Sequence, residues 1–194
     1  GIKAEIINYG GIVVSLYIPD KNGKLDDIVL GYDDFNSYLS NAPFFGAIIG
    51  RHANRIEGAS FELNGKKYTL FNNDGRNHLH GGAKGFDKVL WEVIEHSDSS
   101  IKLFYRSADG EEGYPGNLDV TVTYALTDDN EWVIKYNAVS DADTVINLTN
   151  HTYFNLSGHD SGSIMSHELK IDADKYTVNN EECIPTGEIK NVSG

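Results

Sequence analysis

The feature that most constrains the fold of this chain is a strict alternation of apolar and polar residues. From Leu118 to Leu126 every second residue is apolar, and the residues between are mostly Asp and Thr. A repeat of two places successive side chains on opposite faces of a strand, so one face is buried and the other is solvated. The polar stretch 127–130 favours a turn, after which the alternation resumes from Trp132 to Ala138. We therefore predict a β-hairpin here.

Similar signals recur along the chain. Asn-Gly pairs, which suit tight hairpin turns, begin at Asn22 and Asn64. Helical periodicity is confined to one short segment, Asp33–Leu39. Many short strands joined by polar turns are typical of a large antiparallel sandwich or barrel, so we predict an all-β fold. Further strands are expected at Ile12–Ile18, Ile28–Leu30, Phe61–Leu63, Lys67–Leu70, Val89–Ile94, Ile101–Tyr105, Thr144–Leu148 and His167–Ile171.

The chain has no internal linker, low-complexity segment or repeat of fixed period, so we assign residues 1–194 to a single β-sandwich domain. Ile184–Glu188 is interpreted as a turn that leads into further structure, yet the sequence stops at Gly194. A sandwich that ended there would leave strand edges unpaired. We therefore expect an incomplete domain, truncated on its C-terminal side. A missing C-terminal segment or a second chain would complete the sheet.

Composition limits the partners. The formal net charge of −13 argues against nucleic acid and anionic membranes, because both favour clustered Lys and Arg. A neutral, hydroxyl-rich ligand is compatible with this charge. Cys183 is the only cysteine, so no intrachain disulfide can form, and a reducing cytoplasmic compartment is the simplest interpretation. Gly1–Glu5 shows no signal-peptide pattern, and the longest apolar stretch, Pro43–Ile49, is too short to span a bilayer.

Three polar clusters are candidates for chemistry. His78 and His80 stand two residues apart, on one side of an extended segment, and two glycines that allow close approach follow them. His151 lies within Asn147–Asn155, which is dense in hydrogen-bonding side chains. Arg51–Arg55 carries two guanidinium groups directly after an apolar stretch. The remaining histidines stand alone and are interpreted as structural or surface residues: His52, His96, His159 and His167.

These clusters allow three interpretations. His78, His80 and His151 could bind a metal ion, but no Asp or Glu falls at a nearby ligand spacing, which makes a metal site the weakest of the three. The polar side chains could instead cap sheet ends and satisfy buried backbone groups. Alternatively, Arg, Asn and His side chains could converge on the hydroxyls of a sugar while one imidazole moves a proton. Spacing alone leaves these interpretations open.

The motifs closely resemble those of the aldose 1-epimerase (galactose mutarotase) family. The resemblance rests on Gly50–Ile56, Asn77–Trp91 and Asn147–Leu156, and shorter matches extend it over the whole chain in the right order. It implies a large antiparallel β-sandwich of galactose-mutarotase type, a supersandwich. It also implies interconversion of the α and β anomers of a free aldose such as galactose or glucose, with no cofactor and no metal.

The resemblance implies roles for four residues. His151 matches the family's general acid, and an imidazole suits that role because its ordinary pKa of about 6.5 lets it give and regain a proton near neutrality. His80 matches the second active-site histidine, which contacts the sugar near its ring oxygen. Asn54 and Arg55 match a pair that hydrogen-bonds sugar hydroxyls. His78 occupies a variable position and is left out of the catalytic set.

This chain also departs from the family pattern. The family's catalytic glutamate and sugar-binding aspartate lie well downstream of the Pro-Thr-Gly-Glu motif, and this sequence ends before either. Glu188 is a poor substitute base, because it matches a turn position. We therefore expect this chain alone to be inactive or nearly so. The alternative function is a non-catalytic carbohydrate-binding or regulatory module that uses the same residues.

Overall fold

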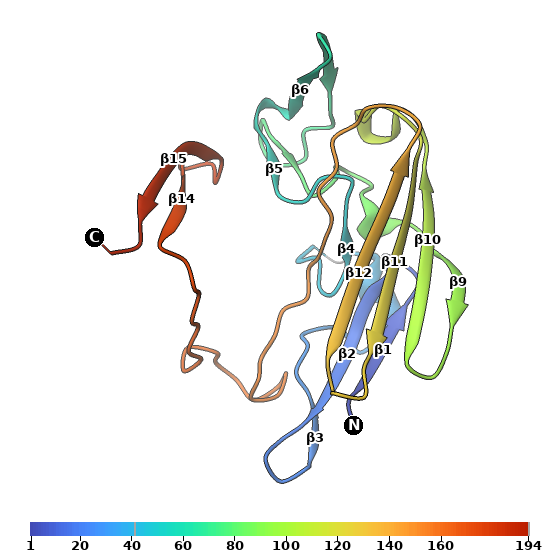
Figure 1. Ribbon diagram of the computed structural model, residues 1–194, viewed down its shortest axis with the longest axis vertical. Coiled ribbons are helices and arrows are strands. Elements are labelled where there is room, and N and C mark those ends of the chain that lie inside the picture. The colour runs from blue at the N-terminus through green and yellow to red at the C-terminus, as the bar shows by residue number, and fades with distance from the viewer. Residues whose placement is uncertain (41, 194) are drawn as a thin grey trace.

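The computed structural model describes residues 1–40 and 42–193, so Gly194, the last residue of the assigned domain, lies outside it. The chain folds mainly into antiparallel strands, and two sheets face one another across the body of the molecule (Figure 1). One sheet has the order β1-β2-β3 and the other β12-β11-β10-β9. Their strands are β1 (Lys3–Ile7), β2 (Ile12–Pro19), β3 (Leu25–Asp27), β9 (Glu92–His96), β10 (Ser100–Ser107), β11 (Leu118–Leu126) and β12 (Trp132–Ser140).

The hairpin predicted from the alternation is confirmed. β11 covers Leu118–Leu126 and pairs with β12 in unbroken register, from Leu118 opposite Ser140 to Leu126 opposite Trp132. Every second residue from Leu118 to Tyr124 faces inward: Val120 and Val122 are 0% exposed, whereas Thr121 and Thr123 are half-buried. The period of two in the sequence thus becomes two chemically different faces of one sheet.

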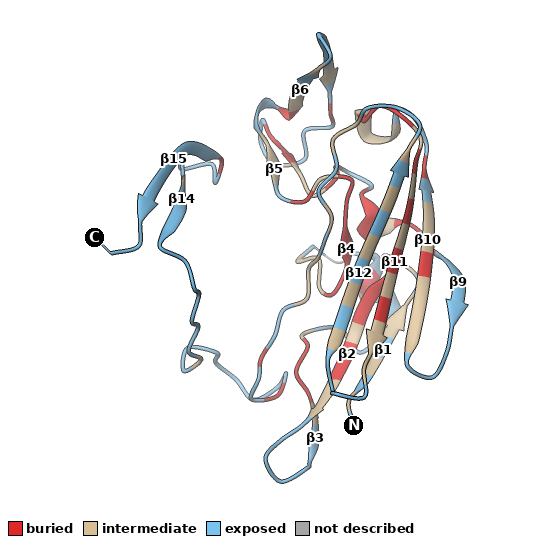
Figure 2. Cartoon of the chain, in the orientation of Figure 1, coloured by how far each residue is buried: buried red, intermediate tan, exposed pale blue. Residues whose placement is uncertain are grey.

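The main core lies between the two sheets. Val13 and Leu16 of β2 join Leu103 of β10 and the inward residues of β11 in one buried cluster, which Figure 2 shows in red. Full burial of such a side chain stabilises the fold by roughly 1.5–3 kcal/mol. Trp91 extends this cluster and donates its indole N–H to the carbonyl of Phe86 at 3.1 Å. This bond ties the segment that follows the glycine pair to the core.

Smaller elements join the body to the polar clusters. β4 (Ile48–Ile49) pairs with β13 (Thr149–Asn150), and β5 (Arg55–Ile56) pairs with β8 (His78–Leu79). β6 and β7 form the hairpin expected around Asn64-Gly65, where both residues adopt positive φ, 53° and 74°. The remaining bounds are β6 (Ser60–Leu63), β7 (Lys66–Thr69), η1 (Glu57–Ala59), η2 (Phe86–Lys88), η3 (Glu111–Gly113) and α1 (Phe35–Leu39), the last confirming the helical turn predicted at Asp33–Leu39.

Three predictions for the last third of the chain are wrong. His167–Ile171 forms no strand, and in Thr144–Leu148 only Asn147 makes a bridge. The turn placed at Ile184–Glu188 is also wrong. Pro185–Asn191 forms strand β15, which pairs with β14 (Lys175–Asn179). The turn lies earlier because the Asn180 side chain accepts the N–H groups of Glu182 and Ile184, both at 3.0 Å.

The β14–β15 hairpin stands apart from the two sheets (Figure 1). Residues 156–174, which lead to it, contain no strand, and their apolar side chains Met165 and Leu169 are 89% and 85% exposed. Figure 2 shows β14 and β15 as almost wholly exposed. An ion pair from Arg76 to Glu182 in the hairpin turn links the hairpin to the body.

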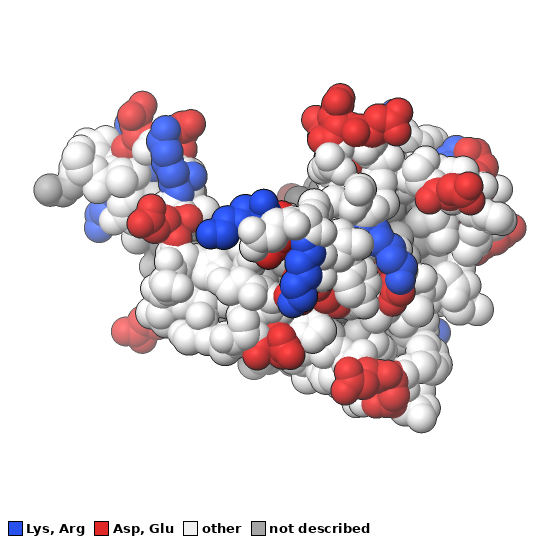
Figure 3. Space-filling model, turned by 90° about the horizontal axis from the view of Figure 1, so that it is seen from below, with Lys and Arg blue, Asp and Glu red and all other residues white. Residues whose placement is uncertain are grey.

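No helix within residues 1–40 and 42–193 is long and apolar enough to cross a membrane. On the face drawn in Figure 3, acidic side chains are scattered, and only a few basic side chains lie among them. This distribution agrees with the net charge of −13.

Candidate active site

The fold brings the three polar clusters together. Residues 51–53 run beside Asn147, because the Ala53 N–H donates to the Asn147 carbonyl at 2.7 Å and the Asn147 N–H donates to the Arg51 carbonyl at 2.9 Å. On the other side, Arg55 of β5 pairs with Leu79 of β8. The segment with Asn54 and Arg55 therefore lies between the segments that carry His80 and His151.

The imidazoles of His80 and His151 are neighbours. Their ring centroids are 5.1 Å apart and the rings are nearly perpendicular. Phe44 packs against both, at 4.9 Å from His80 and 5.7 Å from His151. Both histidines are half-buried. The arrangement places two proton-carrying groups within reach of one small ligand.

The surroundings of His80 fix its tautomer. The Asn54 backbone N–H donates to His80 Nδ1 at 2.9 Å. The backbone N–H of His80 donates in return to the Asn54 carbonyl at 3.1 Å. Because Nδ1 accepts, a neutral ring carries its proton on Nε2, which is then a hydrogen-bond donor. Burial lowers the pKa of His80 to about 4, with smaller contributions from the charges of His151 and Arg55. His80 is therefore a neutral donor at neutral pH.

His151 is held by its backbone and by the residue before it. Its N–H donates to the Ala47 carbonyl at 2.8 Å, which continues the β4–β13 pairing. The Asn150 side chain donates to the Gly46 carbonyl at 2.8 Å and to the Tyr124 hydroxyl at 3.2 Å. Asn150 thus satisfies backbone and core groups and fixes the strand that presents His151.

Arg55 and Asn54 lie beside this pair. The Arg55 Nε donates to Asp74 Oδ2 at 2.7 Å, and its terminal nitrogen approaches Asn54 Oδ1 at 3.5 Å. Asp74 is set in a tight turn closed by two backbone hydrogen bonds with Asn77. The Arg55 side chain is 24% exposed, so part of it is accessible to a ligand. Asp74 was not predicted from the sequence, where only an Asp-Gly turn signal marks it.

Two residues of the clusters have structural roles instead. His78 is fully buried, with Nδ1 bonded to the Phe71 carbonyl at 2.7 Å and Nε2 to the Tyr114 hydroxyl at 2.6 Å. Both of its ring nitrogens are occupied, so it cannot join His80 and His151 around a metal ion. Arg51 is 2% exposed and donates to Ser107 Oγ and to the carbonyls of Ser107, Ala108 and Pro115. Capping of buried backbone thus explains part of these clusters.

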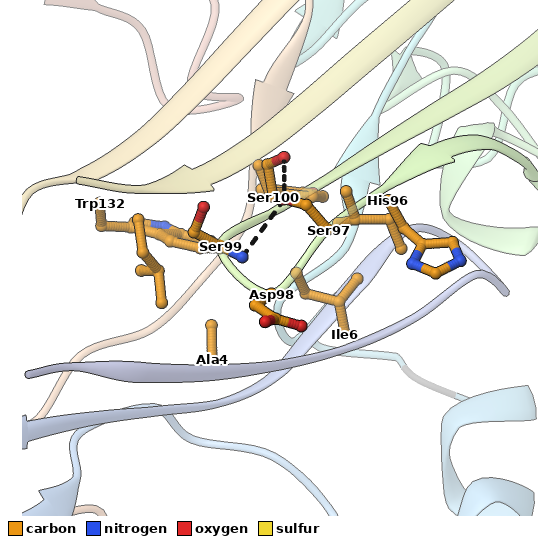
Figure 4. A pocket seen from close by; sticks show the side chains of 11 residues that line it. Ala4, Ile6, His96, Ser97, Asp98, Ser99, Ser100 and Trp132 are labelled. Atoms are coloured by element: carbon orange, nitrogen blue, oxygen red, sulfur yellow. Dashed lines mark hydrogen bonds between the residues drawn. The ribbon is translucent and has the colours of Figure 1, made fainter. Parts of the chain in front are cut away.

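The described residues contain no group of three or more His, Cys, Asp or Glu side chains arranged to hold a metal ion. A hollow of about 310 Å³ lies elsewhere, at the end of the sandwich (Figure 4). It is bordered by Ala4 and Ile6 of β1, by the 97–100 turn and by Trp132, and it shares no residue with the histidine pair. His96 and Asp98 also border this hollow, whereas His80, His151, Asn54 and Arg55 lie together elsewhere in the fold.

Comparison with known proteins supports a family assignment. The family model described as Aldose 1-epimerase matches residues 1–194. Galactose mutarotase of Bos taurus is 47% identical over 193 residues, and aldose 1-epimerase of Escherichia coli K12 is 40% identical over 194. Each alignment covers 100% of this chain and 56% of the relative. The chain thus spans little more than half the length of these curated relatives.

Solved structures agree. The crystal structure of a GalM/aldose epimerase homologue from C. elegans superposes with a TM-score of 0.92 at 35% identity, over 100% of this chain and 59% of that one. Galactose 1-epimerase from Lactobacillus acidophilus NCFM gives 0.83 at 28% identity, over 100% and 56%. The all-β sandwich of galactose-mutarotase type predicted from the sequence is therefore confirmed. Since the family model matches from the first residue to the last, this chain belongs to the aldose 1-epimerase family.

Proposed function

We propose that the protein containing this chain interconverts the α and β anomers of a free hexose such as galactose or glucose. The observation that carries the proposal is the pair of imidazoles 5.1 Å apart, with Arg55 and Asn54 beside it. Amide and guanidinium groups suit sugar hydroxyls, because each supplies several directed hydrogen bonds. The names of the relatives, galactose mutarotase and aldose 1-epimerase, point to the same class of reaction.

In the proposed mechanism, a base removes the proton of the anomeric hydroxyl while protonated His151 gives its proton to the ring oxygen. The bond between C1 and the ring oxygen breaks and an open-chain aldehyde forms. After rotation about the C1–C2 bond, the hydroxyl adds to the other aldehyde face and both protons return. The neutral His80, with its proton on Nε2, donates a hydrogen bond near the ring oxygen. Asn54 and Arg55 hold the other hydroxyls.

We further propose that the base lies outside these 194 residues and that this chain alone is inactive or nearly so. Asp74, a carboxylate next to the proposed site, is already engaged by Arg55 in an ion pair at 2.7 Å. We also propose that residues 1–194 are part of one domain located in the cytoplasm. Experiments on activity therefore use the protein encoded by the complete reading frame.

Polarimetry on freshly dissolved α-D-galactose and α-D-glucose tests the proposal. We expect the protein from the complete reading frame to speed the approach to equilibrium. His151→Ala should lower kcat by about 10²–10⁴-fold, the usual contribution of a positioned acid. His96→Ala, which removes an exposed imidazole on β9, is the matched control and should leave the rate unchanged. If the complete protein leaves the spontaneous rate of both sugars unaltered, the site is better explained as a carbohydrate-binding module.

A further inference from the structure

The loop between β10 and β11 supports the segments that carry the site residues. Ser107 and Pro115, at its two ends, accept hydrogen bonds from Arg51, whose segment continues into Asn54 and Arg55. Tyr114 of the same loop bonds the buried His78, two residues before His80. One loop therefore contacts both segments that carry the proposed sugar-binding residues.

A third contact of this loop is made by Glu112. Its carboxylate accepts the backbone N–H of Ala83 at 3.0 Å and that of Lys84 at 2.9 Å, one on each oxygen. Hydrogen bonds to a charged acceptor are stronger than neutral ones, and two parallel bonds also fix direction. Glu112 itself adopts a left-handed backbone conformation, with φ of 51°, between Gly110 and Gly113. The loop is thus shaped to aim this side chain at the glycine pair.

The glycine pair matches this contact. A Cβ atom at Gly82 would lie 2.1 Å from Glu112 Oε2, so a side chain at this position and the carboxylate would exclude each other. At Gly81 a Cβ atom would lie 1.7 Å from the Gly50 carbonyl oxygen. The two glycines therefore let the Gly81–Lys84 segment lie between the Glu112 carboxylate and the Gly50–Arg51 backbone.

His80 precedes this clamped segment directly and has a φ of 53°. Its ring is oriented by the hydrogen bond from the Asn54 backbone N–H to Nδ1, which requires the Gly81–Lys84 backbone to stay in place. Displacement of a reacting group by about 1 Å can cost about 10²-fold in rate. Loss of the Glu112 clamp would free the backbone that sets the position of the imidazole.

We propose that Glu112 is a positioning residue, whose carboxylate holds the Gly81–Lys84 backbone so that His80 Nε2 is directed at the substrate. This inference rests on the proposed function for its link to catalysis. The clamp itself is a property of the folded chain. The two are separable, because the orientation of the His80 ring can be observed without any reaction.

The test compares Glu112→Ala, Glu112→Gln and the control Glu95→Gln in the protein encoded by the complete reading frame. Glu95 is an exposed carboxylate on β9, paired with Lys102, so its substitution removes the same charge away from the loop. Three readouts are taken: the melting temperature, kcat/KM for mutarotation of α-D-galactose, and ¹⁵N NMR of the His80 ring, whose shifts report the tautomer and the pKa.

We expect Glu112→Ala to lower kcat/KM about 10- to 100-fold in protein that remains folded at the assay temperature. The His80 pKa should rise from about 4 toward the ordinary value as the ring loosens. Glu112→Gln keeps one acceptor oxygen and should show smaller changes in the same direction. Glu95→Gln should match the wild type in all three readouts.

Unchanged His80 NMR signals in folded Glu112→Ala and Glu112→Gln would overturn the inference, because Glu112 would then have only a structural role. Loss of activity that merely follows the loss of folded protein, with normal His80 signals in the folded fraction, would do the same. If the wild-type protein shows no mutarotation while the NMR changes occur, the proposed function fails and the positioning of His80 by Glu112 stands.

Discussion

His80 shows how the surroundings of one residue select one chemical form of it. The Asn54 N–H occupies Nδ1, so the proton of the neutral ring is confined to Nε2. Burial and nearby positive charge lower its pKa to about 4. An imidazole that stays neutral and keeps one defined donor suits hydrogen bonding to a substrate better than proton shuttling.

The same effect makes stability depend on pH. Burial lowers the pKa of His80 to about 4 and also lowers the pKa values of His78 and His52. The unfolded chain, with histidine pKa values near 6.5, therefore binds more protons between about pH 4 and 6.5. The contribution of these neutral, buried histidines to the free energy of unfolding is fully present above about pH 6.5. It is lost as the pH falls toward their pKa values in the folded protein. Urea titrations should show a lower free energy of unfolding at pH 5 than at pH 7.

His80→Gln provides the check on this assignment. It removes one of the three groups, so the difference between pH 7 and pH 5 should shrink. A free energy of unfolding equal at both pH values in the wild type would contradict the prediction. His96→Ala, which removes an exposed imidazole, should keep the wild-type dependence.

The contact between Arg55 and Asp74 concerns substrate affinity. Asp74 orients the guanidinium at 2.7 Å, and both side chains are partly exposed, at 24% and 36%. Asp74→Asn keeps the size of the side chain and removes the charge. In the complete protein we expect KM to rise by about two- to fivefold with little change in kcat, as for the loss of a partly exposed ion pair that serves binding. Steady-state polarimetry measures both, and a fall in kcat alone would contradict this role.

Among the secondary-structure elements, the long alternating runs could be predicted, whereas the short segments of the last third of the chain could not. The β11–β12 hairpin follows from its pattern because one face is buried. Segment 167–171 alternates only at Leu169 and Ile171, and both are exposed in a segment that forms no strand. Strand β15 contains Pro185 and Gly187, which the sequence presents as turn residues. Pairing with β14 overrides that preference.

The candidate site divides in the same way. Asn54, Arg55, His80 and His151 could be proposed from motifs, because each lies in a short and distinctive run of residues. Phe44, Asp74 and Glu112 could not, because their importance depends on contacts with segments distant in sequence. The glycines on either side of Glu112 adopt positive φ, and this backbone conformation cannot be assigned a side-chain direction from sequence alone.

The contact between Arg51 and the 107–115 loop, which supports the site, leads to a prediction about stability. Arg51 is 2% exposed and its guanidinium makes four hydrogen bonds to the 107–115 loop. Arg51→Lys keeps the charge, but an ammonium cannot reproduce the planar fork, so buried acceptors lose their partners. We expect the free energy of unfolding to fall by about 3 kcal/mol or more, measured by urea denaturation. Arg106→Lys, on an exposed pair at 3.5 Å, is the control and should change it by less than about 0.5 kcal/mol.

The molecule as a whole combines a packed body with an extended C-terminal part. Residues 156–174 contain no strand, and Lys170 in their midst has an 88% exposed side chain. Limited trypsin digestion of the 194-residue chain should therefore cut at Lys170 before Lys102 or Lys135, which lie within β10 and β12. Mass spectrometry of early fragments identifies the first site. Earlier cleavage within the β10–β12 sheet would contradict this division of the molecule.

The pairing of β4 with β13 has a consequence for how the site forms during synthesis. Ile49 lies opposite Thr149, so the strand that presents His151 pairs with residues made about a hundred positions earlier. Such distant pairing is slow, because the entropy cost of closing a long loop comes before any stabilising contact forms. While the ribosome is still translating the first 150 residues, the Asn54–Arg55 segment has no His151 beside it. The site is therefore assembled late, after the sheets that support it can begin to form.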